Sequence, residues 1–98
     1  MYAISFDLDT NSLKELYPNS WQNAYGDIRK ELEKFGFNWQ QGSVYFADAD
    51  NKKVNAVQCV LAAQHLSKTF PWFKGSFRDI RMLRIEELND LSPAVNAV

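Results

Sequence analysis

Apolar and polar residues alternate at the start of the chain. The apolar positions are Tyr2, Ile4, Phe6 and Leu8, with small or polar residues between them. A period of two is typical of a strand with one buried face. Residues 1–8 are therefore predicted to form a strand. Residues 77–85 form a second extended run in which both faces carry apolar side chains, and we predict a strand there too.

Two segments have the spacing of helices instead. Residues 19–35 place apolar side chains every three or four positions and are followed by Gly36, a common residue just after a helix. Residues 54–68 show a weaker form of this pattern. Three possible N-cap residues precede it: Asp48, Asp50 and Asn51. The polar stretch 9–18 interrupts these patterns, and we expect a loop with room for one helical turn.

Between the predicted helices, two short alternating runs indicate a β-hairpin. Residues 37–39 and 44–46 are the runs, and Gly42 lies in the turn between them. The order is strand, helix, strand, strand, helix, strand. With right-handed crossovers this gives an α+β, ferredoxin-like βαββαβ fold, a four-stranded antiparallel sheet with two helices on one face. We expect one domain over residues 1–98, with a core of about 1–86 and a short tail.

In this topology the first and third strands are central, and one face of the sheet has no helix over it. The residues expected on that face are Ala3, Ser5, Asp7, Ser43 and Tyr45, with Asp79, Arg81, Leu83 and Ile85 of the last strand. A face that mixes apolar and polar groups is a candidate interaction surface, and pairing two such sheets would bury it. We therefore expect a twofold homodimer.

Composition narrows the class of protein. The chain has 98 residues, of which 46% are hydrophobic and 23% charged, so it is expected to fold as a globular domain. A single cysteine, Cys59, and a single histidine, His65, rule out an internal disulfide and a Cys/His zinc site. No apolar run approaches the roughly 20 residues that span a bilayer. We expect a soluble protein of the cytoplasm.

Positive charge gathers near the end of the chain although the net charge is −1. The basic residues there are Lys68, Lys74, Arg78, Arg81 and Arg84, and the one acidic residue among them is Asp79. Such a local excess could contact phosphates. An ordinary solvated strand face explains it equally well. Asp79 would then simply neutralise an arginine, the commoner outcome for such a carboxylate.

Two carboxylates near the end of the first strand are the main candidates for chemistry. Asp7 and Asp9 would lie on the same side if the strand continued, and could hold a divalent ion such as Mg²⁺ or activate a nucleophile. The alternative is structural: Asp9 caps the next segment and Asp7 pairs with an arginine. Spacing alone favours this alternative. Ser43 likewise has two interpretations, a turn-stabilising hydroxyl or a site residue beside the first strand.

Three aromatic residues could stack on nucleic-acid bases, as such residues do in single-strand binders. Trp39 is expected to pack in the core, whereas Trp72 and Phe73 fit either a loop anchor or a stacking platform. His65 has no partner at useful spacing, so it is expected to be a surface or half-buried residue and not a general base.

Four motifs together resemble the virulence-associated protein D (VapD) family. They are M-Y-A-I-S-F-D-L at residues 1–8, G-F-N-W-Q-Q-G-S-V-Y at 36–45, W-F-K at 72–74 and F-R-D-I-R at 77–81. The resemblance runs from Met1 to about Leu91. It implies a ferredoxin-like homodimer similar to the Cas2 proteins of CRISPR systems, with endoribonuclease activity. Some relatives act as the toxin of a toxin-antitoxin pair, which implies a small antitoxin protein as a partner.

The same resemblance implies functional residues. Asp7, Ser43 and Asp79 correspond to the catalytic positions and Leu13 to a nearby substrate-positioning residue. Asp7 would act as base or ion ligand, and an arginine would offset charge on the scissile phosphate. The candidate arginines are Arg78, Arg81 and Arg84. The expected function is cleavage of messenger RNA, and whether it needs Mg²⁺ stays open. The alternative is a dimeric module that binds RNA or protein without cleaving.

Overall fold

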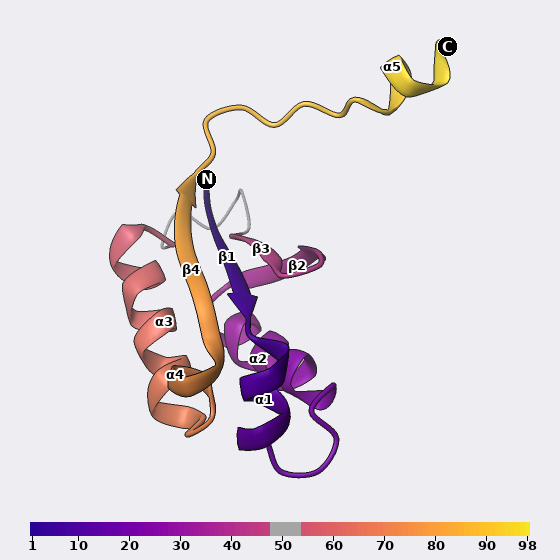
Figure 1. Cartoon of the computed structure of the whole chain (residues 1–98). Helices are drawn as coiled ribbons and strands as arrows, with labels where there is room; N and C mark the ends of the chain where they lie inside the picture. Colours follow the sequence, from indigo (N-terminus) through magenta and orange to yellow (C-terminus); the bar gives the residue numbers. More distant parts are fainter. Residues whose placement is uncertain (48–53) are drawn as a thin grey trace.

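The computed structural model describes residues 1–47 and 54–98. Its strands are β1 (Tyr2–Leu8), β2 (Phe37–Gln41), β3 (Val44–Ala47) and β4 (Phe77–Arg84). Its helices are α1 (Thr10–Leu16), α2 (Asn23–Lys34), α3 (Ala56–Thr69), α4 (Phe73–Ser76) and α5 (Ser92–Asn96). The antiparallel sheet has the order β2-β3-β1-β4 (Figure 1). The predicted ferredoxin-like fold, with β1 and β3 central, is confirmed.

The core lies between one face of the sheet and the two long helices. From β1 it takes the alternate residues Ile4, Phe6 and Leu8, as the period of two requires. Helix α2 adds Ala24, Ile28 and Leu32, and α3 adds Cys59, Ala62 and Leu66. Steps of three and four residues bring each helical set onto one stripe. Among the described residues, no helix is long and apolar enough to cross a membrane.

The segment expected to be a loop after β1 is a helix instead. The carboxylate of Asp9 caps α1 by accepting hydrogen bonds from the Asn11 N–H and the Ser12 hydroxyl. Leu13 is then turned into the core, where it is completely buried. One apolar anchor and a side-chain cap suffice for a helix of this length. The polar residues that broke the strand pattern are therefore the start of a helix.

Other boundaries also differ from the predicted ones. Helix α2 begins at Asn23 and not at residue 19. Residues 20–22 form a turn instead, in which the Asn23 N–H donates a hydrogen bond to the Ser20 carbonyl. The cap of α3 is Asn55, whose side chain accepts from the Gln58 N–H. The earlier candidates for that cap lie outside the described residues: Asp48, Asp50 and Asn51.

On the face of the sheet away from the helices, the side chains contributed by β3 differ from the expected ones. Ile4 of β1 pairs directly with Tyr45, so both point to the helix side. Tyr45 is only 2% exposed and its ring stacks on Phe6. The prediction that Tyr45 lies on the uncovered face is therefore wrong. Val44 and Phe46 occupy that face instead, and both are half-buried.

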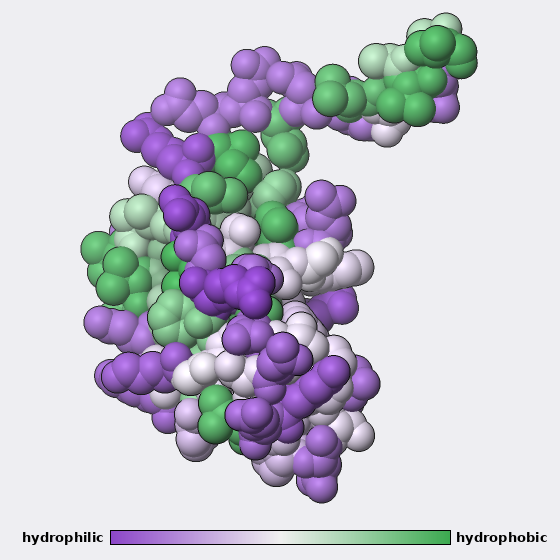
Figure 2. Space-filling model, viewed as in Figure 1, coloured by the Kyte–Doolittle hydropathy of each residue, from purple (hydrophilic) through white to green (hydrophobic). Residues whose placement is uncertain are grey.

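The end of the chain leaves the domain. Met1 and Ile85 exchange backbone hydrogen bonds at the end of the sheet, and the following residues project away from β4 (Figure 1). The tail carries apolar side chains that cover nothing in this chain (Figure 2). The largest of them are Leu88, Leu91, Val95 and Val98, all exposed. The predicted short tail is therefore present, with a five-residue helix that the sequence pattern did not reveal.

Replacement of a core leucine tests this account of the core. Leu66→Ala removes a fully buried side chain at the contact of α3 with the sheet and leaves a cavity, so we expect a loss of about 2–5 kcal/mol in free energy of unfolding. Leu16→Ala, at a leucine 49% exposed, is the control and should cost about 1 kcal/mol or less. Urea denaturation measures both, and equal losses would contradict the packing described.

Candidate active site

Two aspartates face one another across the β1–β4 pair on the uncovered face of the sheet. Asp7 is the direct partner of Asp79 in the antiparallel register. The ladder then shifts, since Leu8 pairs with Phe77, so Arg78 is an additional residue on β4. Such a bulge bends the strand and re-aims a side chain. Both carboxylates are accessible, with side-chain exposures of 63% for Asp7 and 48% for Asp79.

Each aspartate has an arginine beside it. Arg81 Nε lies 3.2 and 3.0 Å from the two carboxylate oxygens of Asp79 and donates to them. The guanidinium of Arg78 is farther from Asp7, with Nη1 at 3.9 Å from Oδ2. Arg84 contacts Glu86 at 3.7 Å and pairs with Tyr2 on the helix side of the sheet. The predicted grouping of Asp7 and Asp79 with Arg78 and Arg81 is therefore present, but the prediction that Arg84 belongs to it is wrong.

Asp9 belongs to the helix cap and not to a pair with Asp7. The bond from the Ser12 hydroxyl, followed by the Asn11 N–H and the charge of Arg78, lowers the pKa of its carboxyl below the usual value. Arg78 Nη2 lies 3.5 Å from Asp9 Oδ1. Both oxygens of Asp9 thus have protein partners. The structural alternative drawn from the sequence, with Asp9 as a cap and Asp7 near an arginine, is what the structure contains.

The carboxylates on the uncovered face offer at most two ligands to a magnesium ion. In the described part of the chain, no three His, Cys, Asp or Glu side chains are grouped as a metal site. Mg²⁺ is commonly held by one or two carboxylates and keeps several of its waters. Asp7, open to solvent, satisfies that requirement, and Asp79 opposite it can add an oxygen where Arg81 releases one. Asp9 does not join them, because its oxygens are engaged in the cap.

Ser43 is near β1, as predicted, but on the helix side of the sheet. Its carbonyl accepts a hydrogen bond of 3.1 Å from the Phe6 N–H. It lines a hollow between α2 and the β2–β3 hairpin, not the surface of Asp7 and Asp79. Leu13, buried in the core, is also away from that surface. The structure therefore brings together the two aspartates and two arginines, and separates Ser43 and Leu13 from them.

The hollow beside Ser43 contains residues that the sequence interpretation missed. Its lining residues are Tyr25, Gly26, Arg29, Trp39, Gly42, Ser43 and Tyr45. Trp39 was expected in the core, yet it is 44% exposed, so that prediction is wrong. The predicted strand order could have indicated that Trp39 is exposed. It makes residues 37–41 an edge strand, where a tryptophan flanked by asparagine and glutamine has few core neighbours.

The remaining aromatic and imidazole candidates have structural roles. Trp72 and Phe73 are buried, and Trp72 packs against the rings of Tyr17 and Phe70, so they are loop anchors and not a stacking platform. Nε2 of His65 lies 2.7 Å from a carboxylate oxygen of Glu31 and so joins α3 to α2. The same contact is the main cause that lowers the pKa of Glu31. The expectation that His65 is no general base agrees with this arrangement.

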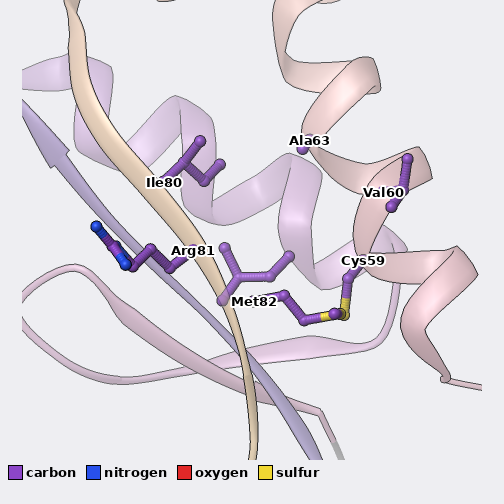
Figure 3. Close-up of a pocket in the computed structure, with 7 residues that line it drawn as sticks. Cys59, Val60, Ala63, Ile80, Arg81 and Met82 are labelled. Carbon is purple, nitrogen blue, oxygen red and sulfur yellow. The ribbon is translucent and has the colours of Figure 1, made fainter.

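A second hollow, between α3 and β4, is apolar (Figure 3). Its labelled residues are Cys59, Val60 and Ala63 from α3 with Ile80, Arg81 and Met82 from β4. Burial raises the pKa of the Cys59 thiol, which therefore stays protonated and unreactive. Exposed apolar side chains surround the hollow on α3, where Figure 2 shows them gathered at the left. They are Val57, Val60 and Leu61. This surface suits contact with protein rather than chemistry.

Comparison with known proteins places this geometry in a family. Residues 1–88 match the family described as CRISPR associated protein Cas2. A relative from Helicobacter pylori, called Endoribonuclease VapD homolog, is 53% identical over 100% of this chain and 99% of its own length. Endoribonuclease VapD 2 of Riemerella anatipestifer is 50% identical over 98% of this chain and 100% of its own. The chain therefore belongs to the Cas2 family and, within it, to the VapD proteins.

The capping role of Asp9 predicts a pH dependence of stability. Because its pKa is lower in the folded chain, its contribution is complete above the unfolded-state pKa of about 3.9 and is lost as the pH falls through the lower folded value. Asp9→Ala should therefore lower the free energy of unfolding at pH 7, and the difference from the parent should shrink as the pH falls below that range. Urea denaturation at several pH values measures this.

The control for this experiment is Asp90→Ala. Asp90 also accepts from a serine hydroxyl, that of Ser92, and its pKa is lowered for that reason. It lies in the exposed tail and borders a surface hollow with Gln41 of β2, away from the core, so its loss should change global stability little at any pH. A constant offset for Asp9→Ala across the acid range would contradict the capping account.

Proposed function

We propose that this protein is an endoribonuclease that cleaves messenger RNA at the uncovered face of its sheet. The observation that carries the proposal is the Asp7–Asp79 pair, accessible to solvent and flanked by Arg78 and Arg81. Carboxylates can accept a proton from an attacking oxygen, and guanidinium groups can hold a phosphate. The names of the H. pylori and R. anatipestifer relatives support the same activity.

The two aspartates have different parts in this mechanism. Arg78 lies 3.9 Å from Asp7, so the Asp7 oxygens have room for a substrate, and Asp7 accepts the proton of the attacking oxygen. Asp79 is bound at both oxygens by Arg81, which fixes the direction of that guanidinium. Arg81 and Arg78 then offset the charge that develops on the scissile phosphate. Asp79 is thus a positioning residue for Arg81.

We propose Mg²⁺ as the ion for this site. Asp7 would hold it, because its carboxylate is accessible, and Asp79 opposite it would add an oxygen that Arg81 releases. A bound magnesium ion neutralises phosphate charge and makes a water molecule easier to deprotonate. The residues of the chain still supply the orientation, since Arg81 is fixed by Asp79 and the bulge places Arg78 beside Asp7.

The proposed active form is a homodimer that pairs the apolar ends of two uncovered sheet faces, near Ala3, and leaves the Asp7–Asp79 end open to RNA. Val44 and Phe46 are half-buried on that face and Leu83 is exposed beside them. Apolar groups on an open sheet face favour contact with a second sheet. The exposed apolar side chains of the tail, Leu91, Val95 and Val98, support contact with a second copy as well.

We also propose that the protein acts as the toxin of a toxin-antitoxin pair and that a small antitoxin protein binds it. The apolar surface of α3 supports this proposal, because Val57, Val60 and Leu61 are exposed together beside the hollow against β4. Patches of this kind mark protein contacts in soluble domains.

Replacement of the proposed base tests the activity. Asp7→Asn keeps the shape of the side chain but removes its basicity, so cleavage of a labelled single-stranded RNA should slow by about 10²- to 10⁴-fold. The matched control is Glu15→Gln, at an exposed carboxylate on α1, which should cleave like the parent. Cleavage is followed on a denaturing gel. Equal rates for parent and Asp7→Asn would overturn the assignment, and binding without cleavage by the parent would indicate a non-catalytic module.

Removal of divalent ions tests the proposed magnesium site. EDTA should abolish cleavage by the parent, and added Mg²⁺ should restore it. In the Asp79→Asn variant, which leaves Asp7 as the one carboxylate, restoration should need a higher Mg²⁺ concentration. Cleavage that continues at the same rate in EDTA would show that Asp7 works without an ion.

A charge on the uncovered face tests the dimer. Leu83→Lys should turn a dimer into a monomer, because two buried lysines would face the apolar partner surface. Leu61→Lys introduces the same charge at a similarly exposed leucine on α3 and should leave the dimer intact. Sedimentation equilibrium distinguishes the two masses. A dimeric Leu83→Lys variant would place the interface elsewhere.

A further inference from the structure

The hollow between α2 and the β2–β3 hairpin is outside the aspartate pair and has a different chemistry. Its volume is about 380 Å³, within the range of small-ligand sites. Aromatic rings line it from three elements, Tyr25 from α2, Trp39 from β2 and Tyr45 from β3. Arg29 adds a guanidinium and Ser43 lies at its hairpin side. The hollow thus combines flat apolar faces with a cation and polar groups.

Trp39 is held in place although it is substantially exposed. Its indole N–H donates a hydrogen bond of 2.9 Å to the Gly42 carbonyl, which ties the ring to the hairpin turn. Arg29 lies over the ring at 4.8 Å from its centroid. Gly42 adopts a φ of 50°, a left-handed conformation suited to glycine, so the turn that receives the indole is itself specified. An exposed ring in a fixed orientation is a prepared stacking surface.

The charge of Arg29 is available to a ligand. Within residues 1–47 and 54–98 its one ion pair is with Glu33 at 3.4 Å, and both side chains are 49% exposed. Exposed pairs of this kind on a helix are weak. The guanidinium can therefore leave the tryptophan ring and turn to a phosphate, which uncovers the ring for a base.

The hollow lies close to Asp7 along the backbone. The Phe6 N–H is bonded to the Ser43 carbonyl, and the Phe6 ring stacks on Tyr45 with centroids 5.8 Å apart. Asp7 is the next residue and points to the opposite face of the sheet. A nucleic-acid strand bound at Asp7 could therefore continue round the end of the hairpin into the hollow.

We propose that this hollow is a nucleobase subsite, in which an unpaired base of the RNA stacks on Trp39 and its phosphate meets Arg29. This rests on the proposed ribonuclease function for the class of ligand. Aromatic faces accept any base, and arginine adds a contact to the backbone, which is the usual chemistry of single-strand binding. Ser43, separated from the aspartates, then supplies a hydrogen-bonding group to the bound nucleotide.

Gly26 offers a way to block the hollow without damaging the fold. A side-chain carbon added there would meet no atom within 4 Å, so the space beside it is open. Gly26 lies inside α2, where alanine is the better helix former. Gly26→Leu should therefore fill part of the hollow, and Gly26→Ala is the matched control that changes the backbone in the same way but leaves most of the space free.

The experiment measures binding of labelled single-stranded RNA by fluorescence anisotropy, with every variant made in the Asp7→Asn background so that no RNA is cleaved. Gly26→Leu should weaken binding about tenfold relative to Gly26→Ala, and Trp39→Ala should do the same while Trp39→Phe keeps most of the affinity. An RNA with abasic positions should bind Gly26→Leu and Gly26→Ala equally. Thermal unfolding of each variant checks that the fold is intact.

The outcomes separate the subsite from the nuclease proposal. Equal affinity of Gly26→Leu and Gly26→Ala for the normal RNA overturns the subsite. That result is also expected if the hollow binds a protein side chain and not a base. A tenfold difference that persists with abasic RNA also overturns it, because the loss would then not concern a base. Failure of Asp7→Asn to stop cleavage would overturn the catalytic assignment alone, and the same binding comparison would then be made with a non-cleavable RNA analogue.

Discussion

The site depends on the pairing of β1 with β4 and on the bulge within it. In a regular ladder the residue opposite Leu8 would be Arg78, and the arginine would share the buried face of that leucine. Burying an unpaired guanidinium is strongly unfavourable. The shift pairs Leu8 with Phe77 and leaves Arg78 as the additional residue, beside Asp7 and Asp9. One irregularity therefore keeps the core apolar and supplies the cation of the site.

The balance of charge at this site follows from the same pairing. Two carboxylates directly opposite one another repel, and the arginines on either side offset that repulsion. They do so unequally, because Arg81 contacts both oxygens of Asp79 whereas Arg78 stays 3.9 Å from Asp7. Exposed ion pairs contribute little to stability, so a phosphate can replace them at small cost. The less tightly paired carboxylate, Asp7, is therefore the more accessible to a ligand.

Sequence reasoning recovered the fold and the Asp7–Asp79 face because alternation in β1 is unambiguous. It failed in β3, where Tyr45 lies between two other apolar residues and a shift of one position exchanges the faces. It missed α1 although the cap at Asp9 and the spacing of Leu13 indicated a helix, because the polar residues between them suggested a loop. It placed Trp39 in the core, but the side chain is 44% exposed because β2 is an edge strand with few core residues beside it.

The sheet itself explains why the residues implied by family resemblance do not form one cluster. Successive residues of a strand point to opposite faces, so Phe6 and Asp7 lie on opposite sides of the sheet. Ser43 is bonded to Phe6 and lies on its side, so Ser43 and Asp7 cannot act on the same atoms. They can act on one extended ligand that passes the end of the hairpin. A flexible single strand meets this requirement and a compact substrate does not. The separation of Ser43 from Asp7 is therefore an argument for a polymeric, single-stranded ligand, and not against a shared function.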